Sequence, residues 1–178
     1  MTTTQPTFWT LTVKSIIAHT LTYFLVGLAA FTLLDYTAKF AEPTTAAYMR
    51  QTNDPIVALG PALQPIRGVL FAVVFYLLRE CLFGRKRGWL TMWAMLALIG
   101  IFSTFGPAPG SVEGLIYTII PASEQLSGGL LEVLTQSLLF AVLLTYWVDH
   151  PTKRWLSWIL GVLFVLVLLM SAMGFFLA

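Results

Sequence analysis

The sequence predicts an all-α integral membrane protein. The expected fold is a bundle of five transmembrane helices with a cytoplasmic N-terminus, an outside C-terminus and two longer outer loops that contain short interfacial helices. Three observations lead to it. Only 10% of the 178 residues are charged and 58% are hydrophobic, whereas a typical soluble domain has about 25% charged residues. The apolar residues form five long runs, and most basic residues lie at one set of ends of those runs. This composition excludes a soluble globule and also a disordered chain, which needs low hydrophobicity and high charge.

Each apolar run is a candidate membrane crossing. A helix needs roughly 20 mostly apolar residues to cross about 30 Å of hydrocarbon. The five candidates span residues 15–34, 66–83, 89–105, 126–148 and 155–178. The second is the weakest, because Arg67, Arg79 and Glu80 lie within it, although all three are near its ends, where long side chains reach the head groups. We therefore expect residues 1–178 to form one transmembrane domain with five crossings.

The orientation of the bundle follows from its Lys and Arg residues, because cytoplasmic connections carry the excess of both. Seven of the ten basic residues fall on one side, namely Lys14, Arg79, Arg85, Lys86, Arg87, Lys153 and Arg154. The other three, Lys39, Arg50 and Arg67, fall on the opposite side. The turns GRKRG and DHPTKR are therefore expected in the cytoplasm, and the protein is expected in a plasma membrane or a bacterial inner membrane.

The two outer connections, Asp35 to Pro65 and Gly106 to Gln125, are longer than the cytoplasmic turns. In the first, the stretch TTAAYMRQTN predicts a short helix on the membrane surface, capped by Thr44 or Thr45. In the second, Ser111 precedes an apolar run that is too short to cross a membrane, which predicts a short helix with Ser111 as its cap. Such loops either line a functional site or only cover the end of the bundle, and the sequence leaves both open.

Polar side chains within the apolar runs give the candidate site. Glu132 and Gln136 are four residues apart, so they share a helix face. A carboxylate near the bilayer centre costs about 2.5–3.5 kcal/mol on insertion scales, so it usually has a partner or a task. Arg67 is the expected ion-pair partner of Glu132, and Glu113 in the second loop is expected to share that arginine. Arg67, Glu113, Glu132 and Gln136 therefore predict a polar ligand-binding pocket open to the outside. The alternative is a buried Arg67–Glu132 ion pair that only fixes helix order.

His19 is expected one turn into the first helix, near the cytoplasmic side. A histidine at this depth either relays a proton or binds a ligand, or it only hydrogen-bonds a neighbouring helix or a head group. The second role is the commoner one.

The sequence offers little other chemistry. Its single cysteine, Cys81, excludes an intramolecular disulfide and any multi-cysteine zinc or iron–sulfur site. The net charge of +2 gives no electrostatic support for a nucleic-acid partner. No HExxH, GxGxxG or P-loop motif occurs. We therefore predict no metal site and name no cofactor.

These features favour a small polytopic membrane protein that binds or passes a polar solute or ion through the outer pocket. Five short helices are few for alternating access, so we expect it to work as an oligomer or as an accessory subunit. Its expected partners are the lipid bilayer and either a second copy or another membrane protein. One alternative is a membrane enzyme that acts on an outer-leaflet lipid or lipid-linked substrate, with Glu132 as acid or base. Another is a structural or assembly subunit that docks through its outer loops.

Overall fold

A computed structural model describes residues 5–177, and this part of the chain contains helices and no strands. The all-α prediction is therefore confirmed. Four helices in the described range are long and apolar enough to cross a membrane. They are α1 (Phe8–Leu33), α5 (Gly60–Leu77), α10 (Gly128–Asp149) and α11 (Arg154–Phe176).

The third apolar run forms a shorter helix than the other four runs do. It forms α7 (Gly88–Ala97), which continues into the π-helical segment η1 (Leu98–Phe102). The two segments have 10 and 5 residues. At 1.5 Å per residue their combined length is about 22 Å, which is less than the roughly 30 Å thickness of the hydrocarbon core. The weakest crossing is thus the third and not the second, and the count of five crossings stays a prediction.

Two helices begin earlier than the sequence indicated. Helix α1 begins at Phe8 instead of residue 15, because the Thr7 hydroxyl accepts the Thr10 N–H and caps it. Helix α5 begins at Gly60 instead of residue 66 and continues through Pro65, which the prediction placed in the outer connection. Pro65 is an interior helix position, so its missing N–H leaves the carbonyl of residue 61 without its i→i−4 hydrogen bond.

Short helices fill both long connections. The first connection contains α2 (Tyr36–Ala41), α3 (Pro43–Ala46) and α4 (Pro55–Ala58). The predicted cap at Thr44 or Thr45 is wrong, because Pro43 already occupies the first helical position and Glu42 is the cap residue. The second connection contains α8 (Val112–Tyr117) and α9 (Ala122–Gln125). Here the prediction is confirmed, since the Ser111 hydroxyl accepts the Gly114 N–H at 2.9 Å.

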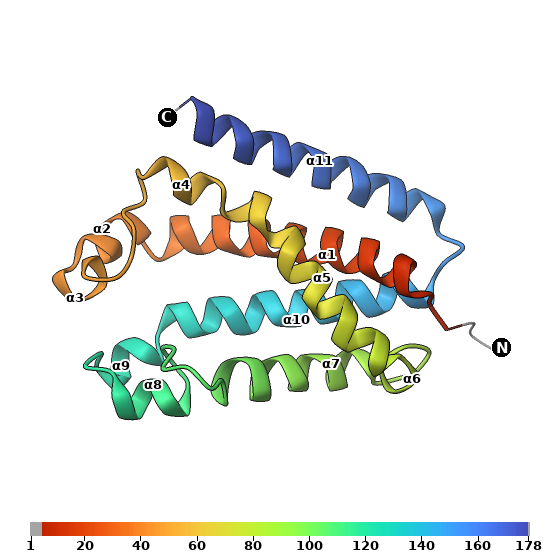
Figure 1. The fold of residues 1–178 in the computed structure, drawn as a ribbon, viewed down its shortest axis with the longest axis horizontal. Coiled ribbons are helices and arrows are strands. Elements are labelled where there is room, and N and C mark those ends of the chain that lie inside the picture. The colour runs from red at the N-terminus through yellow and green to blue at the C-terminus, as the bar shows by residue number, and fades with distance from the viewer. Residues whose placement is uncertain (1–4, 178) are drawn as a thin grey trace.

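The long helices run between two ends of the molecule (Figure 1). One end, which we call the basic-turn end, holds the start of α1, the turn between α6 (Arg79–Leu82) and α7, and the turn between α10 and α11. The opposite end, which we call the loop end, holds α2 to α4, α8 and α9. The basic turns therefore share one end, as the charge pattern requires, and which end faces the cytoplasm stays a prediction.

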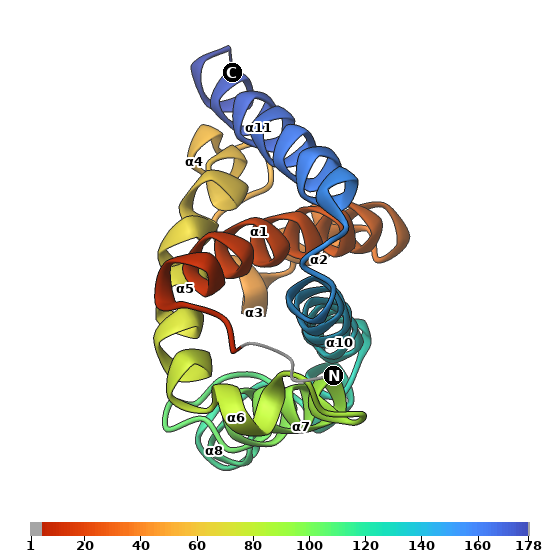
Figure 2. The ribbon, with the colours of Figure 1, turned by 90° about the vertical axis from the view of Figure 1, so that its right-hand side faces the viewer.

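Helix α1 is central and packs against α5, α10 and α11, whereas α7 packs against α10 (Figure 2). The contact between α1 and α5 is close because α5 has a glycine there. A Cβ added at Gly68 would lie 2.5 Å from the Ile16 Cα, and small residues allow helix backbones to approach in this way.

The tightly packed core lies toward the basic-turn end. Its buried members are Leu11, Ala18, Phe75, Leu82, Phe83, Met92, Phe140, Ala141, Leu144 and Val148. In a lipid environment such a core stabilises mainly through van der Waals contacts, because lipid tails are as apolar as its side chains. The basic-turn end is thus the well-filled half of the bundle.

A candidate ligand cavity at the loop end

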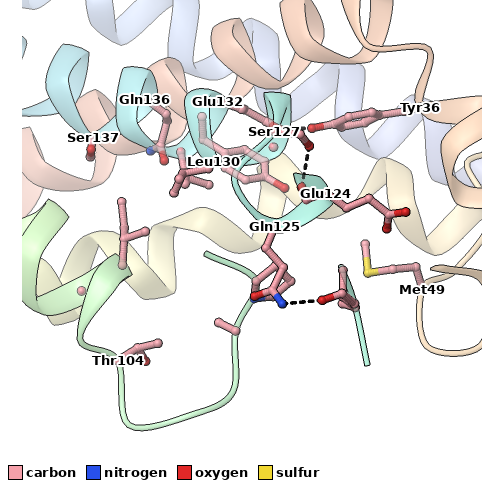
Figure 3. Close-up of a pocket in the computed structure, with 18 of the residues that line it drawn as sticks. Tyr36, Met49, Thr104, Glu124, Gln125, Ser127, Leu130, Glu132, Gln136 and Ser137 are labelled. Atoms are coloured by element: carbon pink, nitrogen blue, oxygen red, sulfur yellow. Dashed lines mark hydrogen bonds between the residues drawn. The ribbon is translucent and has the colours of Figure 1, made fainter. Parts of the chain in front are cut away.

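A cavity of about 600 Å³ lies in the half of the bundle nearer the loop end. Helices α1, α5, α7–η1 and α10 form its walls, and residues of the two long connections cover it (Figure 3). This volume is in the range of pockets that enclose drug-sized ligands, roughly 300–1,000 Å³. The polar groups that line it are mainly His19, Tyr23, Tyr36, Lys39, Arg67, Glu124, Glu132 and Gln136.

His19 is held between two glutamines on the cavity wall. It is 1% exposed, and its ring lies edge-on to Phe71 and Phe140. Gln64 donates its Nε2 to the Gly60 carbonyl at 3.0 Å, which leaves the Gln64 Oε1 to accept the His19 Nε2–H at 3.1 Å. The His19 Nδ1 must then accept, and the Gln136 Nε2 donates to it at 3.2 Å. This arrangement selects one neutral tautomer and ties α1 to both α5 and α10.

Glu132 is bound by a tyrosine from the first connection. The Tyr36 hydroxyl donates to the Glu132 carboxylate, across 96 residues of sequence (Figure 3). Burial, and then this hydrogen bond, raise the pKa of the Tyr36 phenol, so the phenol stays a donor at neutral pH. The Lys39 ammonium also attracts the Glu132 carboxylate and donates to the Ser127 hydroxyl at 3.4 Å. These contacts hold α2 over the cavity.

Arg67 lines the same cavity but has no acidic partner. Within residues 5–177 no carboxylate lies within 4.0 Å of its guanidinium. The salt bridge in this part of the chain joins Arg50 to Asp54 instead. Its guanidinium carbon lies 6.0 Å from the centroid of the Phe71 ring, which is a cation–π contact. The prediction of an Arg67–Glu132 ion pair is therefore wrong. The Glu132 carboxylate accepts a hydrogen bond from the Tyr36 hydroxyl instead.

Another part of the cavity wall is mainly apolar. It is formed by Leu96, Gly100 and Ile101 of α7–η1 and by Ile120, with Thr104 as a polar member. Helix η1 has π-helical hydrogen bonding, with the Ser103 N–H donating to the Leu98 carbonyl at 3.0 Å. Such segments are frequent at functional sites. The cavity is therefore two-faced, with polar groups mainly on α1, α2, α5, α9 and α10 and a mainly apolar wall at α7–η1 and Ile120.

A single buried glutamine fixes the second connection over the cavity. Gln125 is 2% exposed, and its Nε2 donates to the Ile120 carbonyl at 2.7 Å (Figure 3). Its Oε1 accepts the Gly110 N–H at 3.3 Å. Because both ends of the amide are used, this part of the cover is held by hydrogen bonds instead of by apolar packing.

The structure brings three of the four predicted site residues together. Arg67, Glu132 and Gln136 all line the cavity. Glu113 lies in the first turn of α8, where it is half-buried, and does not line the cavity. Whether any of these residues binds a ligand stays a prediction.

The sequence analysis missed or misplaced three residues of the site, two that line the cavity and one that supports it. His19 lines the cavity three turns into α1 and not one, because α1 begins at Phe8. Gln64, which supports His19, was placed in the outer connection Asp35 to Pro65, whereas it lies inside α5. Tyr36 lies outside every apolar run, so nothing in the local sequence indicated that it would reach Glu132. The one available signal was the presence of two polar side chains, His19 and Gln136, within apolar runs.

Within residues 5–177, no group of three or more His, Cys, Asp or Glu side chains is placed to hold a metal ion. Cys81 is exposed and belongs to α6, at the basic-turn end. Comparisons of the chain with protein-family models, with curated proteins and with solved structures gave no match.

Proposed function

We propose that the chain is a multi-pass protein of a plasma or bacterial inner membrane that binds or passes a polar solute or ion through the loop-end cavity. In this proposal the chain crosses the membrane five times, with the basic-turn end in the cytoplasm and the loop end outside. It works as an oligomer or as an accessory subunit of a larger membrane complex. The proposed ligand-binding residues are Arg67, Glu132 and Gln136, which line the cavity, and Glu113, which lies outside its lining.

The observation that carries this proposal is Arg67 on the wall of a cavity large enough for a ligand. A charged side chain inside a membrane segment is costly, and such residues usually mark substrate or ion pathways. A guanidinium without a carboxylate partner is suited to attract a polar or anionic group. A buried ion pair that only fixed helix order would instead have closed Arg67 onto Glu132.

Binding is favoured over catalysis by the state of the two candidate acid–base groups. The Glu132 carboxylate accepts the Tyr36 hydroxyl, and both ring nitrogens of His19 are hydrogen-bonded to glutamine amides. A general base needs a free lone pair within reach of its substrate, and the His19 ring has none left. The Glu132 carboxylate keeps lone pairs, but the Tyr36 hydroxyl fixes its position, which suits a group that shapes a site. Arg67 and Lys39 keep donors for a ligand.

Cysteine labelling from the outside tests the proposal. In a Cys81→Ser background, Thr104→Cys places a thiol on the cavity wall at the end of η1, and Val165→Cys places one on the exposed face of α11. In sealed vesicles of known orientation, an impermeant polar thiol reagent is expected to modify Thr104→Cys and not Val165→Cys. Unchanged Cys81 in the wild-type protein is expected to react only after the vesicles are opened.

Equal and negligible labelling of both variants contradicts an outward-open pocket. Labelling of Cys81 from the outside contradicts the proposed orientation. Each result is read on protein that elutes as a single species, so that loss of fold is separated from loss of access.

A further inference from the structure

We infer that the ligand of this cavity is an anionic amphiphile, whose phosphate or carboxylate head binds Arg67 and whose hydrocarbon part lies against the apolar wall of η1. This inference rests on the proposed function, because it uses the same cavity and names the class of ligand. It is carried by the charge at Arg67, by the two-faced lining and by the way α5 and α7 separate.

The charge at Arg67 selects the head group. Of the two carboxylates that line the cavity, Glu132 is bound by Tyr36 and attracted by Lys39, and Glu124 lies exposed in α9. Arg67 therefore keeps its donors for an incoming group. A planar guanidinium fits phosphate and carboxylate oxygens with two parallel hydrogen bonds, and these charge-assisted bonds are among the strongest in proteins.

The apolar wall selects the body of the ligand. A small inorganic ion needs neither a volume of about 600 Å³ nor a wall formed by Leu96, Ile101 and Ile120. Gly100, a glycine of this wall, has no atom within 4 Å of an added Cβ. The wall is thus open at a position that a larger side chain would fill, which suits a ligand with an apolar chain beside its head.

The separation of α5 and α7 gives such a ligand access from lipid. The two helices meet through α6 at the basic-turn end, and from there α5 rises to pack on α1 and α11 while α7 stays on α10 (Figures 1 and 2). Both nevertheless line the cavity. Both helices carry exposed apolar side chains, namely Leu63 and Ile66 on α5 and Leu98 and Ile99 on η1. An entrance between the two helices would therefore have an apolar rim, which faces hydrocarbon at lower cost than a polar one.

Three probes separate the head from the chain. Dodecyl phosphate has both, inorganic phosphate has only the head, and dodecanol has only the chain. The intact protein in neutral detergent micelles is titrated with each probe, and bound molecules are counted by native mass spectrometry. We expect one dodecyl phosphate per chain, bound at least about tenfold more tightly than either fragment.

Matched variants locate the bound probe. Arg67→Gln is expected to weaken dodecyl phosphate binding about tenfold, whereas Arg50→Gln removes the same charge from an exposed loop site and is expected to change nothing. Gly100→Leu fills the apolar wall and is expected to weaken dodecyl phosphate but not inorganic phosphate. Gly161→Leu, in α11 with equally open surroundings and outside the cavity, is the control for a bulkier helix residue.

The results distinguish failure of this inference from failure of the proposed function. Equal binding of dodecanol and dodecyl phosphate overturns recognition of the head, without depending on any variant. Inorganic phosphate that binds as tightly as dodecyl phosphate, with no effect of Gly100→Leu, overturns the amphiphile and leaves a polar-solute site. Absence of binding by all three probes overturns the inference alone if Thr104→Cys is still labelled from outside, and overturns both if it is not.

Discussion

The two ends of this bundle are built by different means. At the basic-turn end, Phe75, Phe140 and Leu144 are completely or almost completely buried in one apolar cluster. At the loop end the same helices separate around a cavity, and the contacts that hold them are single polar links such as His19–Gln64 and Tyr36–Glu132. The filled end resembles a protein core, and the loop end resembles a binding site with a cover.

This difference suggests that the filled end mainly stabilises the fold and that the loop end mainly binds the ligand. Apolar packing gains from every added contact and is insensitive to pH or ligand. A few hydrogen bonds around a cavity fix side chains in place and leave room for a guest. Substitutions at the filled end are therefore expected to change the free energy of unfolding most, and substitutions at the loop end to change ligand binding or local opening more than global stability.

The largest effect is expected at the filled end, from Phe75→Ala. Phe75 is 0% exposed, and its loss leaves a void that the surrounding helices fill only in part. We expect a loss of about 3–5 kcal/mol in the free energy of unfolding, measured by denaturant titration in mixed micelles. Phe105→Ala makes the same chemical change at a fully exposed phenylalanine and is expected to be nearly neutral. Equal losses for both variants would mean that this end is not the stabilising one.

The next effect is expected where the filled end meets the cavity, at Gly68. Its added Cβ would overlap the α1 backbone at Ile16, so Gly68→Ala forces α1 and α5 apart. We expect a loss of about 1–3 kcal/mol. Gly161→Ala has no atom near its added Cβ and is expected to be neutral or stabilising by up to about 1 kcal/mol, because alanine is the better helix former. The two substitutions thus differ in sign, and the same sign for both would contradict a close α1–α5 contact.

The filled end could largely be predicted from the sequence, and the cavity only in part. Long apolar runs fix the helices because each run must satisfy its own backbone in lipid. The shared face of Glu132 and Gln136 follows from helix periodicity alone. The Ser111 cap is equally local, since its hydroxyl bonds an N–H only three residues away.

What the sequence could not predict depends on contacts between distant parts of the chain. The choice of Tyr36 over Arg67 as the partner of Glu132 joins residues 96 positions apart. The His19–Gln64 link depends on α5 continuing through Pro65, and no local rule requires a helix to do so. Local patterns therefore located the polar groups but did not pair them.

A global effect of similar size is expected from the clamp around His19, the hydrogen bonds that Gln64 and Gln136 make to its ring. Gln64→Leu leaves the buried Nε2–H of His19 without an acceptor, which is expected to cost about 1–3 kcal/mol. The double variant with His19→Leu removes both partners and is expected to recover part of that loss, because the half-buried Gln136 amide is then the one donor left without its acceptor. Unfolding titrations of the single and double variants measure the difference. A neutral Gln64→Leu would show that this amide does not hold the imidazole.

The smallest effect is expected at the surface of the loop end, from Asp54→Asn. The hydrogen bond from Arg50 at 2.7 Å, and then the one from the Ile56 N–H at 3.0 Å, hold the pKa of the Asp54 carboxyl below its ordinary value of 3.8. A carboxyl whose pKa is lowered by folding stabilises the folded state above the ordinary pKa, and this contribution is lost as the pH falls through the lowered value.

Hydrogen exchange at residues 50–58 is the sensitive measurement for Asp54, since local opening there need not unfold the filled end. In the wild-type protein we expect exchange at these residues, corrected for the intrinsic pH dependence, to quicken as the pH falls past 3.8, the ordinary pKa of the carboxyl, and through its lowered value, while residues 137–148 stay protected. Asp54→Asn keeps a helix-capping side chain on α4 but is expected to remove this dependence on pH. Arg50→Gln is expected to weaken it through the other partner of the same salt bridge. If the filled end opened together with residues 50–58, the two ends would be one cooperative unit, and the division between a stabilising end and a binding end would fail.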